Sequence, residues 1–145
     1  MYLIGRTYTF SAAHTIQGHP RCGQMHGHNY KVLVKVRGNE LDKNHMVLDF
    51  ADLDKVVKPI LEPMDHMYLA YIEDPKQIEL HISEVFHLLA PASTAECLAR
   101  YIYEAIVHTL VVEFNYDVEV TIWETDKSFA TYLKREANYT ATHGS

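Results

Sequence analysis

The segment that decides the fold is His28-Asn-Tyr-Lys-Val-Leu-Val-Lys-Val-Arg37, which has the clearest strand pattern in the chain. One set of alternate positions is tyrosine and valine, and the other is mostly basic, as in a strand that buries one face. His26 lies two positions before His28, so both imidazoles point to that apolar face, with Gly27 between them adding no bulk. Two imidazoles on one face can share a metal ion. The sequence therefore predicts a strand that begins with a pair of metal ligands.

A third histidine ends another strand pattern. Residues 2–13 are rich in β-branched and aromatic side chains, and in Tyr8-Thr-Phe-Ser-Ala-Ala-His14 the aromatic residues share a face with His14. A buried histidine needs a partner, and a third imidazole completes a set of three. Three histidines leave a tetrahedral zinc ion one open position, which is the catalytic arrangement, whereas structural zinc sites usually carry several cysteines. We predict that His14, His26 and His28 bind a catalytic Zn²⁺ ion.

The loop between these two strands, residues 15–25, contains one cysteine. Cys22 lies in a polar stretch near the predicted cation, which would lower the thiol pKa and favour a reactive thiolate. Cys22 as a fourth zinc ligand is the competing interpretation. Cys97 lies next to the apolar stripe of a predicted helix, so we expect it to be a small core residue. Apart from His66, the remaining histidines show no spacing partner and are expected to be incidental, namely His19, His45, His81, His87, His108 and His143.

The rest of the chain predicts an α+β domain. Two helices are expected, one at 50–61 with Asp49 as its N-cap and one at about 94–113 that opens with a Ser93–Glu96 capping box. Two further strands, 117–125 and 128–134, alternate in hydrophobicity. The order ββ-α-α-ββ predicts a four-stranded antiparallel sheet with both helices on one face. Such a small sheet has exposed edges that other subunits would cover, so we expect a homo-oligomer.

Composition excludes several classes of function. The chain has 145 residues, enough for one domain, and a formal net charge of −6, which argues against general affinity for nucleic acid. No apolar stretch approaches the length of a membrane span, and no signal-peptide core is visible, so a cytoplasmic protein without a membrane partner is expected. Two cysteines make no disulfide framework.

Three acidic or basic residues outside the histidine motif are candidates for chemistry. Glu124 follows Val118, Val120 and Ile122 on the apolar face of its strand, which places a carboxylate either in water at the strand end or against a ligand amino group. Asp65 and His66 are adjacent. They form either a solvated loop or a catalytic site in which a carboxylate orients the histidine. Because adjacent side chains rarely bond to each other in that way, we expect a different acid to be the partner of His66.

The chain resembles the 6-pyruvoyl-tetrahydropterin synthase / 6-carboxy-tetrahydropterin synthase family over residues 2–134. Six motifs occur in the family's order, namely Phe10-Ser-Ala-Ala-His14, Cys22-x3-His26-Gly-His28-Asn-Tyr30, Val47-Leu-Asp49-Phe50, Met64-Asp65-His66, Ser93-Thr94-Ala-Glu96 and Trp123-Glu124-Thr125. The resemblance implies the tunnelling fold, with subunits assembled as a hexamer of two stacked trimeric barrels. It implies a single domain over 1–145, with a C-terminal tail at 135–145.

The resemblance also assigns roles to the candidate residues. It implies that His14, His26 and His28 hold Zn²⁺ and that the substrate is 7,8-dihydroneopterin triphosphate. Cys22 would be the general base, and Asp65 and His66 would be a proton relay contributed across a subunit interface. Glu124 would anchor the pterin ring and join the relay, and Thr94 would add a polar contact. These residues are the predicted catalytic, metal-binding and substrate-binding set.

Two branches of the family remain open. The three-residue gap between Cys22 and His26 resembles the queuosine branch, which releases acetaldehyde and triphosphate and leaves 6-carboxy-tetrahydropterin. The stretch Trp123-Glu124-Thr125-Asp126 is as similar to the biopterin branch, which makes 6-pyruvoyl-tetrahydropterin. Two departures, the loss of an asparagine at Ala70 and a longer segment at 67–92, leave a third alternative, a zinc- and pterin-binding protein without this catalysis. We expect a 6-carboxy-tetrahydropterin synthase.

Overall fold

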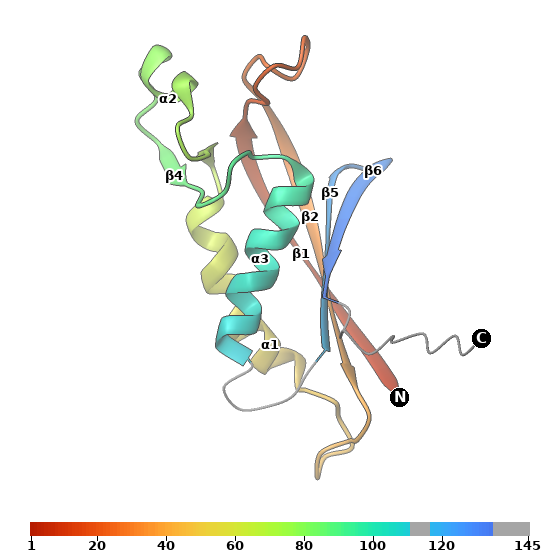
Figure 1. Ribbon diagram of the computed structural model, residues 1–145. Coiled ribbons are helices and arrows are strands. Elements are labelled where there is room, and N and C mark those ends of the chain that lie inside the picture. The colour runs from red at the N-terminus through yellow and green to blue at the C-terminus, as the bar shows by residue number, and fades with distance from the viewer. Residues whose placement is uncertain (111–116, 135–145) are drawn as a thin grey trace, which may run out of the picture.

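The computed structural model describes residues 1–110 and 117–134, and these form one curved sheet covered by helices on one face. The sheet has six strands in the order β4-β3-β1-β2-β5-β6. Helices α1 and α3 lie side by side against the same face of it (Figure 1). The α+β prediction is confirmed, but the predicted count of four strands is too small. The sheet is also mixed rather than wholly antiparallel, because β3 and β4 pair in the parallel direction.

Strands β1 (Tyr2–His14) and β2 (His26–Gly38) are the backbone of the sheet. They pair antiparallel over their whole length, from Tyr2 opposite Gly38 to His14 opposite His26. The alternation predicted for β2 is confirmed, because Tyr30 and the three following alternate valines have no exposed surface. Burying this whole apolar face against the helices is the main favourable contribution to folding.

The first helix, α1 (Phe50–Leu61), has the predicted bounds. The Asp49 side chain accepts a hydrogen bond from the backbone N–H of Ala51 at 2.8 Å, which confirms the predicted N-cap. Leu53, Val57 and Leu61 are its buried residues. Phe50 opens the same stripe but remains 42% exposed, because it lies at the helix end beneath the guanidinium of Arg6.

The second predicted helix corresponds to α3 (Ala95–Leu110), and its predicted continuation to residue 113 lies outside the described residues. The predicted capping residue is wrong. Thr94 caps the helix by accepting the backbone N–H of Cys97 at 3.3 Å, whereas the Ser93 hydroxyl donates to the carbonyl of Thr15 at 3.1 Å. The sequence offers two adjacent hydroxyls, and only the tertiary contact with Thr15 decides between them. Cys97 packs against the hydrophobic core, as expected.

Residues 62–92 contain elements that the sequence pattern does not show. A 3₁₀ turn (Glu62–Met64) leads into β3 (Met67–Ala70), α2 (Pro75–Glu79) and β4 (Val85–His87). β3 pairs parallel with β1 at Ala12 and Ala13, and β4 pairs parallel with β3. Strands of three or four residues are too short to show an alternating pattern, so the sequence does not predict them.

The last two strands, β5 (Asp117–Thr125) and β6 (Ser128–Leu133), form the predicted hairpin. β5 pairs antiparallel with β2, which places Trp123 opposite Lys31. The predicted tail at 135–145 lies outside the described residues.

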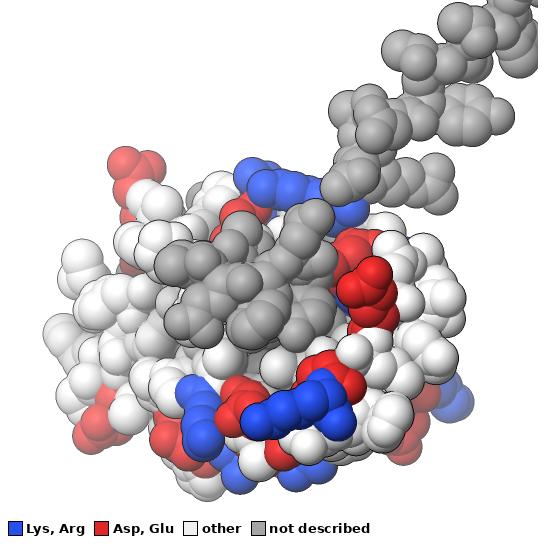
Figure 2. Space-filling view, turned by 90° about the horizontal axis from the view of Figure 1, so that it is seen from below, with Lys and Arg blue, Asp and Glu red and all other residues white. Residues whose placement is uncertain are grey.

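Charges of the two signs lie next to one another on the face shown in Figure 2. Ion pairs also form between neighbouring strands, where Arg37 of β2 contacts Asp117 at 3.4 Å and Glu119 at 3.2 Å on β5. Among the described helices, none combines the length and apolar character needed to cross a bilayer.

Candidate metal centre and active site

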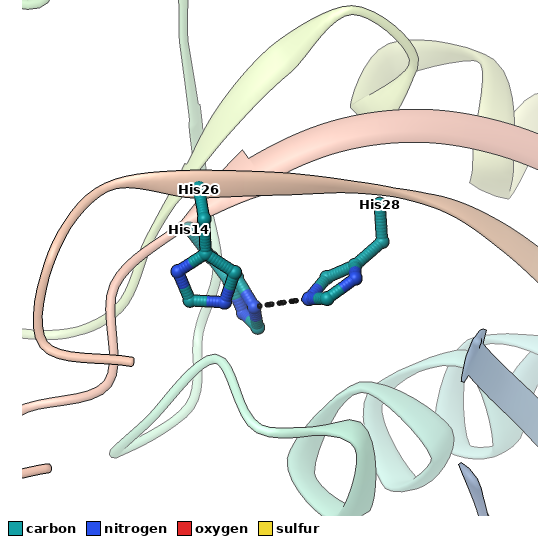
Figure 3. Close-up of side chains that lie close together, drawn as sticks. All are labelled: His14, His26 and His28. Carbon is teal, nitrogen blue, oxygen red and sulfur yellow. Dashed lines mark hydrogen bonds between the residues drawn. The ribbon is translucent and has the colours of Figure 1, made fainter. Parts of the chain in front are cut away.

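Three histidines meet at the end of the β1–β2 pair (Figure 3). His14 lies directly opposite His26, and His28 lies opposite Ala12 on the same face. Their ligand atoms all lie within 4.8 Å of one another. The prediction that two imidazoles of one strand and a third from its neighbour share a face is therefore confirmed.

Backbone carbonyls orient two of the three rings. Nδ1 of His14 lies 2.7 Å from the carbonyl oxygen of Ser93, and Nδ1 of His26 lies 2.7 Å from that of Gln24. Because a carbonyl only accepts, each Nδ1 carries the proton and each Nε2 keeps its lone pair. Histidines that bind a metal through one ring nitrogen usually donate the N–H of the other to a carbonyl or carboxylate in this way.

The spacing of the nitrogens suits a zinc ion. Nε2 of His28 lies 3.2 Å from Nε2 of His14. Two nitrogens about 2.0–2.1 Å from one tetrahedral zinc ion lie roughly 3.3 Å apart, which is close to that separation. With Nε2 of His14 unprotonated, Nε2–H of His28 donates to it, and a metal ion would replace that shared proton. The residues present therefore fit the predicted Zn²⁺.

Burial keeps the ligands in the form that binds metals. His14 has no exposed surface, and this burial, with a smaller contribution from the neighbouring imidazoles, lowers its pKa to about 4. Burial also lowers the pKa of His28, although the negative charge of Glu124 opposes the shift. His14 is therefore neutral near pH 7, as a metal ligand must be.

Glu124 faces this cluster. The ladder between β5 and β6 shifts register between Trp123 and Thr125, so Glu124 lies at an irregularity that turns its side chain. Its Oε1 lies 3.9 Å from Nε2 of His14, and the side chain is 23% exposed. The interpretation of Glu124 as a solvated strand end does not fit this position. A carboxylate here adds negative charge beside a bound cation and can accept N–H donors from a ligand.

The loop that carries Cys22 is held by backbone hydrogen bonds. The Cys22 carbonyl accepts the N–H of Ile16 at 2.8 Å, and its N–H donates to Nδ1 of His19 at 2.8 Å. Gly23 donates to the carbonyl of His19, and a Cβ at Gly23 would lie 2.5 Å from that oxygen, so only glycine fits the turn. His19, which was expected to be incidental, therefore orients the backbone of Cys22.

The thiol of Cys22 is partly exposed. Among the residues that the structure describes, the ligand atoms gathered at the metal centre belong to the three histidines, and the Cys22 sulfur is not among them. This favours the reactive thiol over the competing role as a fourth ligand. Its role as general base stays a prediction.

Asp65 and His66 form a pair, and the expectation that another acid partners His66 is wrong. Nδ1 of His66 lies 2.9 Å from Oδ2 of Asp65, because His66 adopts a positive φ of 63° that folds its side chain back. The other oxygen of Asp65 accepts the N–H of Ser11 at 2.9 Å. That bond, followed by the bond from His66, lowers the pKa of Asp65. His66 is 81% exposed at the edge of β1, so the pair is preformed and open to a partner.

Two further residues bear on the site. Thr94 caps α3, and its predicted contact with the substrate stays a prediction. Tyr30 was not among the predicted site residues, yet its ring is fully buried between Phe10 and His28. Within the described part of the chain its hydroxyl has no hydrogen-bond partner. Burial and the charge of Glu124 raise its pKa, so this hydroxyl is a neutral donor near the metal centre.

Comparisons with known proteins agree with this geometry. The model of the family described as 6-pyruvoyl tetrahydropterin synthase matches residues 3–135. A 6-carboxy-5,6,7,8-tetrahydropterin synthase of Haemophilus influenzae is 32% identical over 91% of this chain and 99% of its own. A 6-pyruvoyl tetrahydrobiopterin synthase of Poecilia reticulata is 31% identical, over 89% and 88% of the two chains. The structure of the Caenorhabditis elegans 6-pyruvoyl tetrahydropterin synthase superposes with a TM-score of 0.70 at 28% identity, over 92% of this chain and 96% of that one.

Proposed function

Because the chain belongs to the 6-pyruvoyl tetrahydropterin synthase family, we propose that it is a zinc-dependent lyase. Its substrate is 7,8-dihydroneopterin triphosphate, and its products are 6-carboxy-5,6,7,8-tetrahydropterin, acetaldehyde and triphosphate. The observation that carries this proposal is the cluster of three imidazoles with the Glu124 carboxylate 3.9 Å from His14. The cluster supplies a catalytic metal site, and Glu124 supplies an acceptor for the amino-pyrimidine ring beside it.

Nε2 atoms of His14, His26 and His28 would hold the zinc ion. When bound, zinc supplies an open coordination position and Lewis-acid polarisation for the hydroxylated side chain of the substrate. The fixed Nδ1–H bonds of His14 and His26 keep both rings aimed at one point, so little reorientation is needed on binding.

The remaining residues bind the ring and move protons. Glu124 accepts two N–H donors of the pterin through one carboxylate, which fixes the ring's orientation. Cys22, as thiolate, takes a proton from a hydroxyl-bearing carbon of the side chain. Asp65 holds the proton of His66 on Nδ1, which leaves Nε2 of His66 to exchange protons at the reacting centre. His66 reaches that centre from another copy of the chain.

The choice of the 6-carboxy product rests on the loop. Relatives named for both branches are about equally similar to this chain, at 32% and 31% identity, so identity alone does not separate them. The gap of three residues between Cys22 and His26 favours the 6-carboxy branch. The biopterin-branch product, 6-pyruvoyl-tetrahydropterin, is the second candidate because of the Trp123–Asp126 stretch.

The test is incubation of zinc-loaded protein with 7,8-dihydroneopterin triphosphate and identification of the products by mass spectrometry. The expected products are 6-carboxy-tetrahydropterin and acetaldehyde. 6-Pyruvoyl-tetrahydropterin would overturn the branch, and bound but unconverted pterin would overturn the enzymatic role. Cys22→Ala should abolish turnover and keep the zinc content, whereas loss of zinc would make Cys22 a ligand.

A further inference from the structure

Buried hydrogen bonds link the 67–92 segment through the side chain and backbone of Thr15 to the candidate metal centre. The series begins at Asp74, where Oδ2 accepts the Tyr68 hydroxyl at 2.8 Å and Oδ1 accepts the backbone N–H of Lys76 at 2.9 Å. The two side chains are buried, with exposures of 7% and 3%. Since both carboxylate oxygens are occupied, Asp74 is fixed, and the single hydroxyl proton of Tyr68 is directed at it.

Thr15 continues the series. Its hydroxyl oxygen lies 2.8 Å from that of Tyr68. Because the Tyr68 proton already points to Asp74, the Thr15 hydroxyl is the donor and the Tyr68 oxygen the acceptor. Thr15 is fully enclosed and directly follows His14 in the chain. The bond therefore fixes the side chain of the residue next to a metal ligand.

Ser93 closes the series onto the ligand itself. Its hydroxyl donates to the carbonyl of Thr15 at 3.1 Å, and its own carbonyl accepts Nδ1–H of His14 at 2.7 Å. Ser93 therefore bonds to His14, the last residue of β1, and to Thr15, which follows it. The orientation of the His14 ring therefore depends on the position of Ser93, which is fixed by its bond to Thr15. Thr15 is in turn held by the hydrogen bond to Tyr68, which Asp74 fixes.

We propose that Asp74, Tyr68 and Thr15 are positioning residues for His14, so the 67–92 segment serves the metal centre. The inference rests on the proposed function in one respect, namely that the three histidines bind a metal ion. A buried hydroxyl in such a series has no water to replace a lost partner, so removing one hydroxyl loosens the next residue. The last residue affected is His14, whose ring must keep its Nε2 directed at the metal ion.

The test measures metal binding rather than turnover. Zinc affinity is determined by competition with a chromogenic chelator, and the ligand geometry is read from the absorption spectrum of the cobalt-substituted protein. Tyr68→Phe and Thr15→Val should each weaken zinc binding about tenfold, as changes behind a metal-bound histidine do. Both should alter the cobalt spectrum. Thr15→Ser keeps the hydroxyl and should restore wild-type affinity and spectrum.

Tyr8→Phe is the matched control. The Tyr8 hydroxyl also donates to a carboxylate, Asp54, at 2.7 Å, but in the middle of β1 and outside the series. This variant should lose stability and keep zinc affinity. Zinc affinity that is unchanged in Tyr68→Phe and Thr15→Val, or lowered equally in Tyr8→Phe, would overturn the positioning role alone. A wild-type protein that binds no zinc would overturn the proposed function as well.

Discussion

At the scale of single residues, the metal centre depends on where protons are held. The Nδ1–H groups of His14 and His26 donate hydrogen bonds to backbone carbonyls, and His14 is neutral because it is buried. The sequence predicts which histidines meet, because side chains two apart on paired strands share a face. It does not predict the supporting contacts, since the Ser93 carbonyl comes from 79 positions further along the chain.

The buried His14 should make the metal-free protein sensitive to acid. Its folded-state pKa of about 4 lies below the ordinary value of about 6.5, so the unfolded chain binds a proton more readily between these values. The stability that its neutral form contributes is full above about pH 6.5 and falls as pH drops toward 4, by at most about 1.4 kcal/mol per pH unit for this group.

Urea unfolding of chelator-treated protein at about pH 7 and about pH 5 measures this effect. His14→Gln should flatten the dependence, whereas His87→Gln, at an exposed histidine, should leave it unchanged. An equal pH dependence in wild type and His14→Gln would contradict the prediction. The pKa of Asp65 is lowered by its hydrogen bonds with Ser11 and His66, so the stability that its charged form contributes is lost only at more acidic pH.

Tyr30 gives a second prediction at this scale. Its buried hydroxyl has no partner among the described residues, so Tyr30→Phe should keep the free energy of unfolding or raise it by up to about 1 kcal/mol. Tyr68→Phe, which removes a bonded hydroxyl, should instead lower it by about 1–2 kcal/mol. Denaturant titration of both variants compares them. Equal losses would show that the Tyr30 hydroxyl has a partner in solution.

At the scale of helices and strands, long elements follow from pattern and short ones do not. α1 and its Asp49 cap were predicted from local sequence, because the cap bond spans two residues. β3 and β4 have four and three residues and gain their stability from parallel pairing next to β1. The pairing of His66 with Asp65 depends on a left-handed backbone conformation at His66, which the sequence does not predict.

The start of α3 can be tested by substitution. Thr94→Ala removes the acceptor for the Cys97 N–H and should lower the free energy of unfolding by about 1 kcal/mol. Thr94→Ser keeps the hydroxyl and should stay close to wild type. Thermal or urea unfolding of the two variants decides whether Thr94 is the cap. A Thr94→Ala variant as stable as wild type would contradict the assignment.

At the scale of the whole molecule, the predicted site residues lie in two places. The metal centre lies on the helix-covered face of the sheet, whereas His66 is 81% exposed at the edge of β1. Among the described residues, the ladder between β3 and β1 pairs Ala12 and Ala13 of β1. We expect the homohexamer, in which each site takes Cys22 from one subunit and Asp65–His66 from another. Native mass spectrometry measures the assembly.

Complementation tests the shared site. Cys22→Ala and His66→Ala should each be inactive alone. Co-expressed in equal amounts, they should recover about a quarter of wild-type activity, because a quarter of the sites combine an intact Cys22 with an intact His66. The variant that carries both substitutions in one chain, expressed alone, is the control and should stay inactive. No recovery in mixed oligomers would place both residues in one chain's site.

The pairing of β1 with β2 has a consequence for proteolysis. The two strands are registered along thirteen residues each, from the end of β1 at His14 to the start of β2 at His26, so the ladder holds these two histidines opposite each other. The Gln24 carbonyl that orients His26 lies on the same side of Arg21 as His26 does. Arg21 lies in that loop and is exposed, which makes the Arg21–Cys22 peptide bond a target for trypsin. A chain nicked there should remain one folded particle that still retains zinc, while the free end carrying Cys22 is no longer held in place. A single cleavage would thus separate metal binding from chemistry without any substitution.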